Sequence, residues 1–150
     1  MTYALLKLVH VLAVVLWVGG MAFAHFFLRP AVQAMEPPHR LALLQRVLQR
    51  FLAAAGWAVL AALASGAGLL AMASAGFVMP WAWSAMAAIG SGMAVIYAVV
   101  RFMFYPRLAR AVAAQDWPAG GAAMAAIRLW VGINLALGVL TIAVAIGGRA

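Results

Sequence analysis

The chain has 150 residues, of which 69% are hydrophobic and only 8% are charged. Soluble domains are typically about 45–50% apolar and about 25% charged, so this composition excludes a water-soluble enzyme, a disordered tail and a secreted disulfide scaffold. The absence of cysteine excludes thiol catalysis and a thiolate metal site. With only two acidic residues, Glu36 and Asp116, chemistry that needs paired carboxylates is also excluded.

Long uncharged stretches predict four membrane-spanning helices, because a span needs about 20 mostly apolar residues. Residues 8–28, 51–100 and 129–148 contain no Lys, Arg, Asp or Glu, and the 50 residues of the second stretch suffice for two passes. The segments Ser74-Ala75-Gly76 and Met79-Pro80 break this stretch, since Gly permits turns and Pro suits a helix start. We predict an all-α integral membrane bundle, a single transmembrane domain over residues 1–150, with spans at 4–28, 40–73, 81–104 and 119–147.

Local signals mark the helix ends. Asp116-Trp117-Pro118 predicts the start of the last helix, with Asp as the cap and Pro in the first turn. Pro106 is predicted to end or kink the third helix.

The start of the chain resembles a cleavable signal peptide, with Lys7, an apolar stretch and then Ala22-Phe23-Ala24. The apolar stretch, however, is longer than a signal core of about 7–15 residues. We therefore interpret this segment as a true span.

The distribution of basic residues predicts the orientation. Eight of the ten lie in or beside the first and third connections: Arg29, Arg40, Arg46, Arg50, Arg101, Arg107, Arg110 and Arg128. The positive-inside rule then places both connections in the cytoplasm and both termini outside. The net charge of +8 is therefore interpreted as attraction to the lipid bilayer rather than to nucleic acid.

One face of the first helix carries the candidate chemistry. At about 100° per residue, a single stripe contains Lys7, His10, Val14, Trp17, Met21 and His25. An ionisable group within a membrane is a functional-site hypothesis by default. His10 is the candidate ligand for a metal or haem iron, with Met21 and His25 as further metal ligands, and Lys7 and Trp17 beside them. Two structural alternatives stay open: Lys7 snorkels to the headgroups, and His10 makes one interhelical hydrogen bond.

Other polar and small residues have weaker signals. Arg101 and Arg128 could bind carboxylates such as haem propionates, or simply anchor the helices at the membrane surface. Asn134 is predicted to hydrogen-bond across helices, and Ser65-Gly66-Ala67-Gly68 to let backbones approach closely. The nine methionines are ligands of the kind Cu(I) prefers, but they also fill apolar cores.

The first and last spans carry a family resemblance. Lys7-Leu8-Val9-His10, Trp17-Val18-Gly19-Gly20, Phe27-Leu28-Arg29-Pro30-Ala31 and Asn134-Leu135-Ala136-Leu137-Gly138 are similar to segments of the copper-resistance protein D (CopD) family. The resemblance implies a multi-pass protein of the bacterial inner membrane that acts in copper uptake or tolerance, often beside a periplasmic copper-binding protein. The chain resembles the short, four-span form, and its other three predicted spans contain no histidine.

A second resemblance is to the HemJ family of four-span haem-pathway oxidases, which also begin with Lys-x-x-His and Trp-x-x-Gly. It implies haem b with His10 as the axial ligand, and an enzyme that would be a haem-dependent membrane oxidoreductase. The chain departs from this family at Phe26-Phe27-Leu28-Arg29-Pro30 and at Ile133-Asn134-Leu135.

Three functional hypotheses follow. The first is a copper-homeostasis protein that uses the His/Met stripe on the first helix and is not an enzyme. The second is a haem-b protein that transfers electrons or oxidises protoporphyrinogen, with His10 as the axial ligand. A di-haem cytochrome needs His pairs on different helices, which only a homodimer that brings two copies of the first helix together would provide. The third is a cofactor-free assembly subunit whose stripe packs against a partner.

Overall fold

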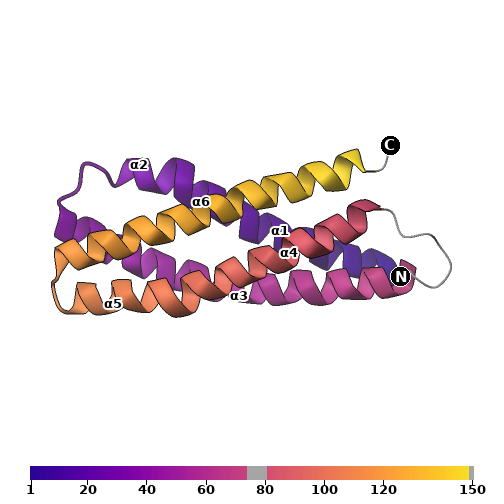
Figure 1. Cartoon of the computed structure of the whole chain (residues 1–150), viewed down its shortest axis with the longest axis horizontal. Coiled ribbons are helices and arrows are strands. Elements are labelled where there is room, and N and C mark those ends of the chain that lie inside the picture. The colour runs from indigo at the N-terminus through magenta and orange to yellow at the C-terminus, as the bar shows by residue number, and fades with distance from the viewer. Residues whose placement is uncertain (74–80, 149–150) are drawn as a thin grey trace.

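The computed structural model describes residues 1–73 and 81–148, and these residues form long helices without any strand (Figure 1). The elements are α1 (Thr2–Phe23), η1 (Ala24–Leu28), α2 (Arg29–Ala31), α3 (Pro37–Ala73), α4 (Trp81–Val99), η2 (Val100–Phe104), α5 (Tyr105–Ala113) and α6 (Trp117–Gly147). The predicted break at Ser74-Ala75-Gly76 and Met79-Pro80 lies outside the described residues.

The predicted all-α class is confirmed, and so is the prediction of four helices that could span a membrane. Four helices are long and apolar enough to cross a membrane: Thr2–Ala31, Pro37–Met72, Trp81–Ala113 and Trp117–Gly147. The predicted cap of the last helix is also confirmed, since the amide N–H of Ala119 donates to Asp116 Oδ1 at 3.0 Å. This bond satisfies one of the N–H groups that a helix start leaves without a partner.

Two proline-containing helices extend further than the sequence predicts. The elements α4, η2 and α5 form one continuous helix, which runs through Pro106 to Ala113 instead of ending at residue 104. The π-helical turn η2 ends two residues before this proline, just as η1 ends two residues before Pro30. Proline cannot donate a backbone hydrogen bond, and a local change of helix type next to it accommodates the missing donor without ending the helix.

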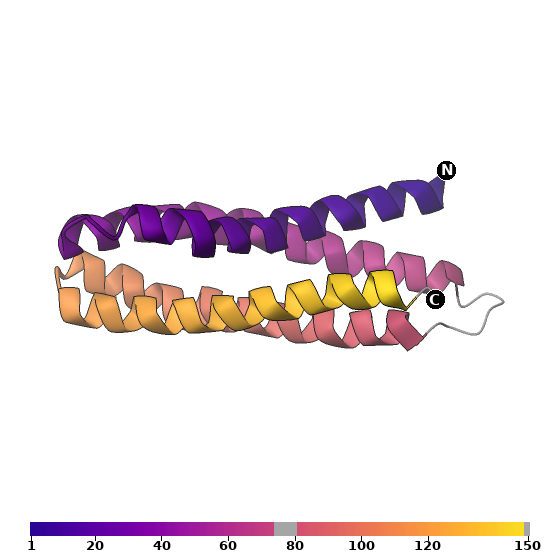
Figure 2. The same ribbon diagram turned by 90° about the horizontal axis from the view of Figure 1, so that it is seen from above.

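The helices form two antiparallel pairs, since α1 packs along α3 while α4 and α5 pack along α6 (Figures 1 and 2). The start of α1 and the end of α6 lie at one end of the bundle. The opposite end contains α2, α5 and the starts of α3 and α6, and carries Arg29, Arg40, Arg107 and Arg110. We call it the basic end.

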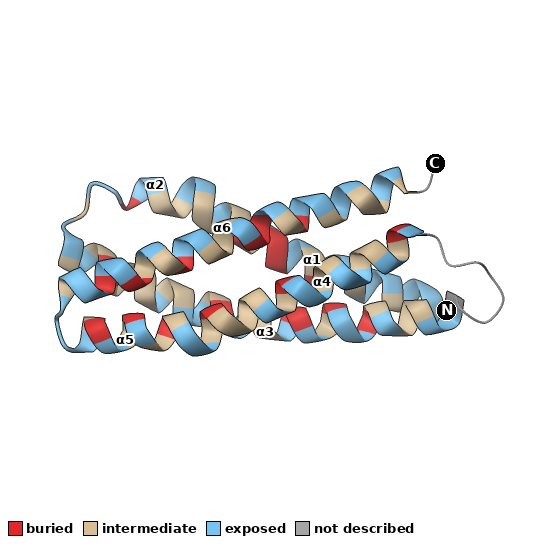
Figure 3. Cartoon of the chain, in the orientation of Figure 1, coloured by how far each residue is buried: buried red, intermediate tan, exposed pale blue. Residues whose placement is uncertain are grey.

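Buried residues form a narrow core along the bundle, while exposed residues line the outer faces of the helices (Figure 3). Large apolar side chains are among the exposed ones, such as Leu12, Phe26, Trp57 and Leu140. An apolar surface of this extent is unfavourable in water and suited to lipid. The chain is therefore a multi-pass membrane protein.

Gly138 sets the close contact between α1 and α6. A Cβ atom at this position would lie 2.9 Å from Cγ2 of Val18 and 3.2 Å from Cε of Met93. The absence of a side chain lets the two helices meet at the level of the main core cluster, which includes Trp17 and Met21.

Candidate functional site

The first candidate site is the imidazole of His10 on α1. Its Nδ1 lies 2.9 Å from the carbonyl oxygen of Ala62 and 3.1 Å from Oγ of Ser65, both on α3. A carbonyl oxygen only accepts hydrogen bonds, so Nδ1 must carry the proton. In the neutral ring, Nε2 then keeps its lone pair and is the nitrogen that can bind an ion.

Ser65 and Gly66 shape the surface of α3 beneath this ring. Ser65 is buried, and its hydroxyl donates to the carbonyl oxygen of Ala61, which leaves Oγ as an acceptor for His10. A Cβ atom at Gly66 would lie 3.2 Å from Cε1 of His10, a tighter contact than is usual, so the absence of a side chain at Gly66 favours the close approach of the ring. The sequence predicts close backbone approach here, but it does not identify Ser65 and Gly66 as neighbours of His10.

The remaining stripe residues lie at different depths. Trp17 and Met21 are 4% and 2% exposed and belong to the main core cluster, whereas Lys7 is exposed. Met21 is about 16 Å and His25 about 22 Å from His10 along the helix axis. One ion therefore cannot bind all three predicted metal ligands. Residues 1–73 and 81–148 contain no group of three His, Cys, Asp or Glu that could hold a metal ion.

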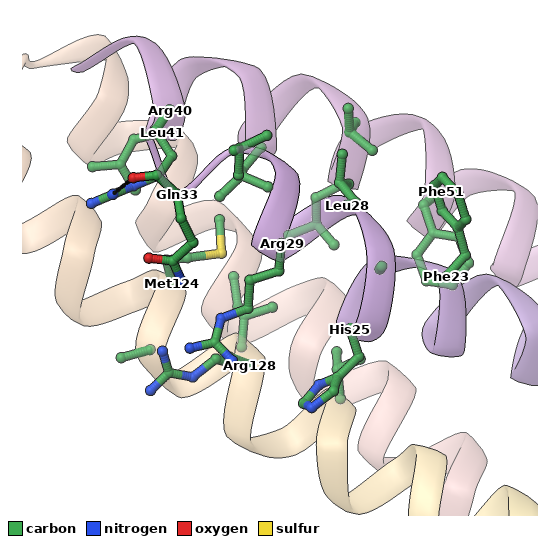
Figure 4. A pocket seen from close by; sticks show the side chains of 18 of the residues that line it. Phe23, His25, Leu28, Arg29, Gln33, Arg40, Leu41, Phe51, Met124 and Arg128 are labelled. Atoms are coloured by element: carbon green, nitrogen blue, oxygen red, sulfur yellow. Dashed lines mark hydrogen bonds between the residues drawn. The ribbon is translucent and has the colours of Figure 1, made fainter. Parts of the chain in front are cut away.

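His25 instead lines a cavity of about 450 Å³ near the basic end (Figure 4). The cavity lies between three segments: the continuous helix made of α1, η1 and α2, the start of α3, and the first half of α6. Three arginines share the lining with it: Arg29, Arg40 and Arg128. Figure 4 shows the guanidinium groups of Arg29 and Arg128 on the same side of the cavity as the His25 ring. The rest of the lining is mostly apolar and includes Leu28, Leu44, Leu48, Phe51 and Ile127.

The two arginines that the sequence pairs as carboxylate ligands separate in the structure. Arg128 lines the cavity, but Arg101 does not. The guanidinium carbon of Arg101 lies 5.6 Å from the ring centroids of both Phe102 and Tyr105, a cation–π arrangement within its own helix. From the sequence, Arg29 and Arg40 are predicted to mark the cytoplasmic side of the membrane and not to line a site. The spacing of four residues between His25 and Arg29 is the signal that could have linked them.

Asn134 on α6 does not show the predicted interhelical bond at its carbonyl oxygen. The residue is 3% exposed, and Oδ1 is buried without a hydrogen-bond partner in the part of the chain that the structure describes. It lines a small void together with Trp17 and Tyr97. Tyr97 does not satisfy it, because the phenol hydroxyl donates to the carbonyl oxygen of Leu52 at 2.8 Å.

Comparison with known proteins identifies one family. Residues 45–147 match the family model described as copper resistance protein D, which is well over half of the chain and includes most of α3 and all of α4, α5 and α6. The match does not include α1, the helix that carries His10. No curated protein and no solved structure matches the chain. The resemblance to haem-pathway oxidases gains no support from the match. The chain belongs to the copper resistance protein D (CopD) family.

Proposed function

We propose that this CopD-family membrane protein handles copper ions in transit, and that His10 is the residue that takes the ion. The observation that carries the proposal is the hydrogen bond from Nδ1 of His10 to the carbonyl oxygen of Ala62, at 2.9 Å. Metal-binding histidines usually donate their second ring N–H to a carbonyl or carboxylate oxygen, which fixes the tautomer and orients the ligating nitrogen. Imidazole is also a ligand that suits copper.

A single imidazole nitrogen suits a passing ion better than a resident one. Met21 and His25 are several helical turns away from His10, so neither can bind the same copper ion as His10. We propose that the remaining ligands at His10 come from a donor molecule, such as a periplasmic copper-binding protein or a second copy of this chain. Copper is then the cargo of the protein and not a permanent cofactor.

The charge distribution supports approach from the end opposite the basic end. The arginines of the basic end repel cations, whereas the sequence before His10 contributes one charged side chain, Lys7. By the positive-inside rule, the end with His10 faces outside and the basic end faces the cytoplasm. In the bacterial inner membrane, His10 would therefore meet copper from the periplasm.

Copper content of cells that express the chain tests the proposal. We expect the intact protein to change cellular copper content and tolerance, and His10→Ala to abolish the change. His10→Gln is the sharper variant, because its amide can still donate to Ala62 but has no lone-pair nitrogen. His39→Ala is the control, since His39 is exposed in the first turn of α3, near the basic end.

An absorption spectrum of the purified protein distinguishes this proposal from the haem hypothesis. We expect no Soret band and binding of Cu(I) that requires His10. A Soret band that disappears in His10→Ala would instead show a haem-b protein. If neither cofactor binds and His10→Gln leaves copper tolerance unchanged at equal protein level, the cofactor-free assembly role becomes the better explanation.

A further inference from the structure

The cavity near the basic end is a second site, separate from His10. It has a volume of about 450 Å³, within the range of about 300–1,000 Å³ typical of small-molecule sites. The elements around it are the continuous helix made of α1, η1 and α2, the first turns of α3 and the first half of α6, which come from both helix pairs. His25 in this lining is about 22 Å along the helix axis from His10.

The cavity combines positive charge with an apolar wall. Arg29, Arg40 and Arg128 line it, and no aspartate or glutamate does. The two acidic residues of the chain are occupied elsewhere and exposed: Glu36 lies 3.8 Å from His39, and Asp116 caps α6. Arg40 donates to the carbonyl oxygen of Gln33 at 3.4 Å, but the described residues supply no carboxylate to Arg29 or Arg128. The site therefore has an excess of positive charge that favours an anion.

The position of these arginines in the bundle indicates what kind of anion fits. Arg29 is half-buried and Arg128 is exposed, and the apolar residues Leu44, Leu48 and Phe51 line the same cavity. A phosphate held between two guanidinium groups is a strong, geometrically specific contact. An apolar wall beside it accepts a hydrocarbon chain. Basic cavities between membrane helices near the cytoplasmic side bind anionic lipid headgroups for this reason.

We propose that this cavity binds one anionic phospholipid, with its phosphate between Arg29 and Arg128 and the upper part of an acyl chain along Leu44, Leu48 and Phe51. The same charge excludes the cavity as a route for copper ions, since a cation entering it would meet three arginines. His25 then hydrogen-bonds the headgroup. The inference is independent of the copper proposal, because it uses no residue that contacts His10.

Native mass spectrometry of the purified full chain, with phosphatidylglycerol or phosphatidylcholine of identical acyl chains added, tests the inference. We expect phosphatidylglycerol to bind with one-to-one stoichiometry and to raise the thermal stability of the protein. Arg29→Gln and Arg128→Gln should each weaken binding by about fivefold, the effect of one basic side chain near anionic lipid. Arg46→Gln is the control, since Arg46 is exposed on α3 and does not line the cavity.

Gly121→Leu provides a variant that keeps every arginine. Gly121 lines the cavity, and a Cβ atom there would meet nothing within 4 Å, so the position has open space in which a larger side chain can begin. We expect weaker phosphatidylglycerol binding with unchanged helix content by circular dichroism. Equal binding of both lipids, equal loss in Arg46→Gln, protection by inorganic phosphate alone, or a haem band that depends on Arg128 would each overturn the inference.

Discussion

Nδ1 of His10 on α1 donates a hydrogen bond of 2.9 Å to the carbonyl oxygen of Ala62 on α3. Interhelical hydrogen bonds in membrane proteins contribute only about 0.6 kcal/mol on average. The larger consequence of this contact is therefore orientation, because it fixes which ring nitrogen carries the proton. A second acceptor, Ser65 Oγ at 3.1 Å, restricts the same nitrogen further.

Gly66→Ala is expected to displace the His10 ring. The new Cβ atom would lie 3.2 Å from Cε1 and 3.5 Å from Nδ1, a tight contact that requires the imidazole or α3 to shift by a few tenths of an ångström. We expect this shift to weaken the hydrogen bond to Ala62. Loss of the groups that orient a metal-binding histidine typically weakens metal affinity by about 10–100-fold. We expect about a tenfold loss of Cu(I) affinity, measured by competition with a Cu(I) chelator.

Gly19→Ala on α1 is the matched control for this experiment. A Cβ atom at Gly19 would meet nothing within 4 Å, so the substitution adds the same methyl group without touching His10. Equal Cu(I) affinities for both variants and the unsubstituted protein would show that the position of the ring does not govern binding.

Gly138→Ala is expected to destabilise the bundle. The added Cβ atom would lie 2.9 Å from Cγ2 of Val18, which is closer than such contacts allow, so the Val18 side chain or the helix that carries it must shift. Overpacking of this kind costs about 1–3 kcal/mol in the free energy of unfolding. An SDS titration in micelles measures the change. Gly90→Ala, where the new methyl group meets nothing within 4 Å, should be neutral or slightly stabilising.

Asp116→Ala is expected to remove the cap of α6. The carboxylate accepts the amide N–H of Ala119 at 3.0 Å, and the loss of such a cap costs about 1 kcal/mol of stability. Asp116→Asn keeps an acceptor oxygen at the same place and should retain most of the stability. If both variants lose the same amount by thermal unfolding in detergent, the charge rather than the cap is responsible.

The predicted orientation has a direct test. The C-terminus is expected to lie outside, because the arginine-rich connections are expected to face the cytoplasm. A reporter fused after Ala150 should therefore be active if it is of the kind that functions only outside the cytoplasm, and inactive if it functions only inside. A reporter inserted after Gln115, in the short connection between α5 and α6, should give the opposite result. A cytoplasmic signal from the C-terminal fusion would reverse the orientation and place His10 near the cytoplasm.

The fold class follows from the sequence because a membrane helix satisfies its own backbone, so the length of each uncharged stretch predicts a span locally. The cap at Asp116 is equally local, since donor and acceptor are three residues apart. The predicted end of the third helix at residue 104 is wrong for a local reason too: the sequence indicates a missing donor at Pro106, but not that the π-helical turn η2 would accommodate it.

The two sites depend on contacts between distant residues. His10 contacts Ser65, which lies 55 positions later in the chain. Arg128 lines the same cavity as Arg29, whereas Arg101 lies over the ring of its sequence neighbour Phe102. Helical periodicity predicts which face a residue occupies, but not which helix packs on that face or at what height. By itself the sequence determined the spans, the cap and the candidate stripe, because these depend on residues within a few turns. Only the tertiary structure decided the partners of His10 and the arginines of the cavity, because helix packing across the bundle brings them together.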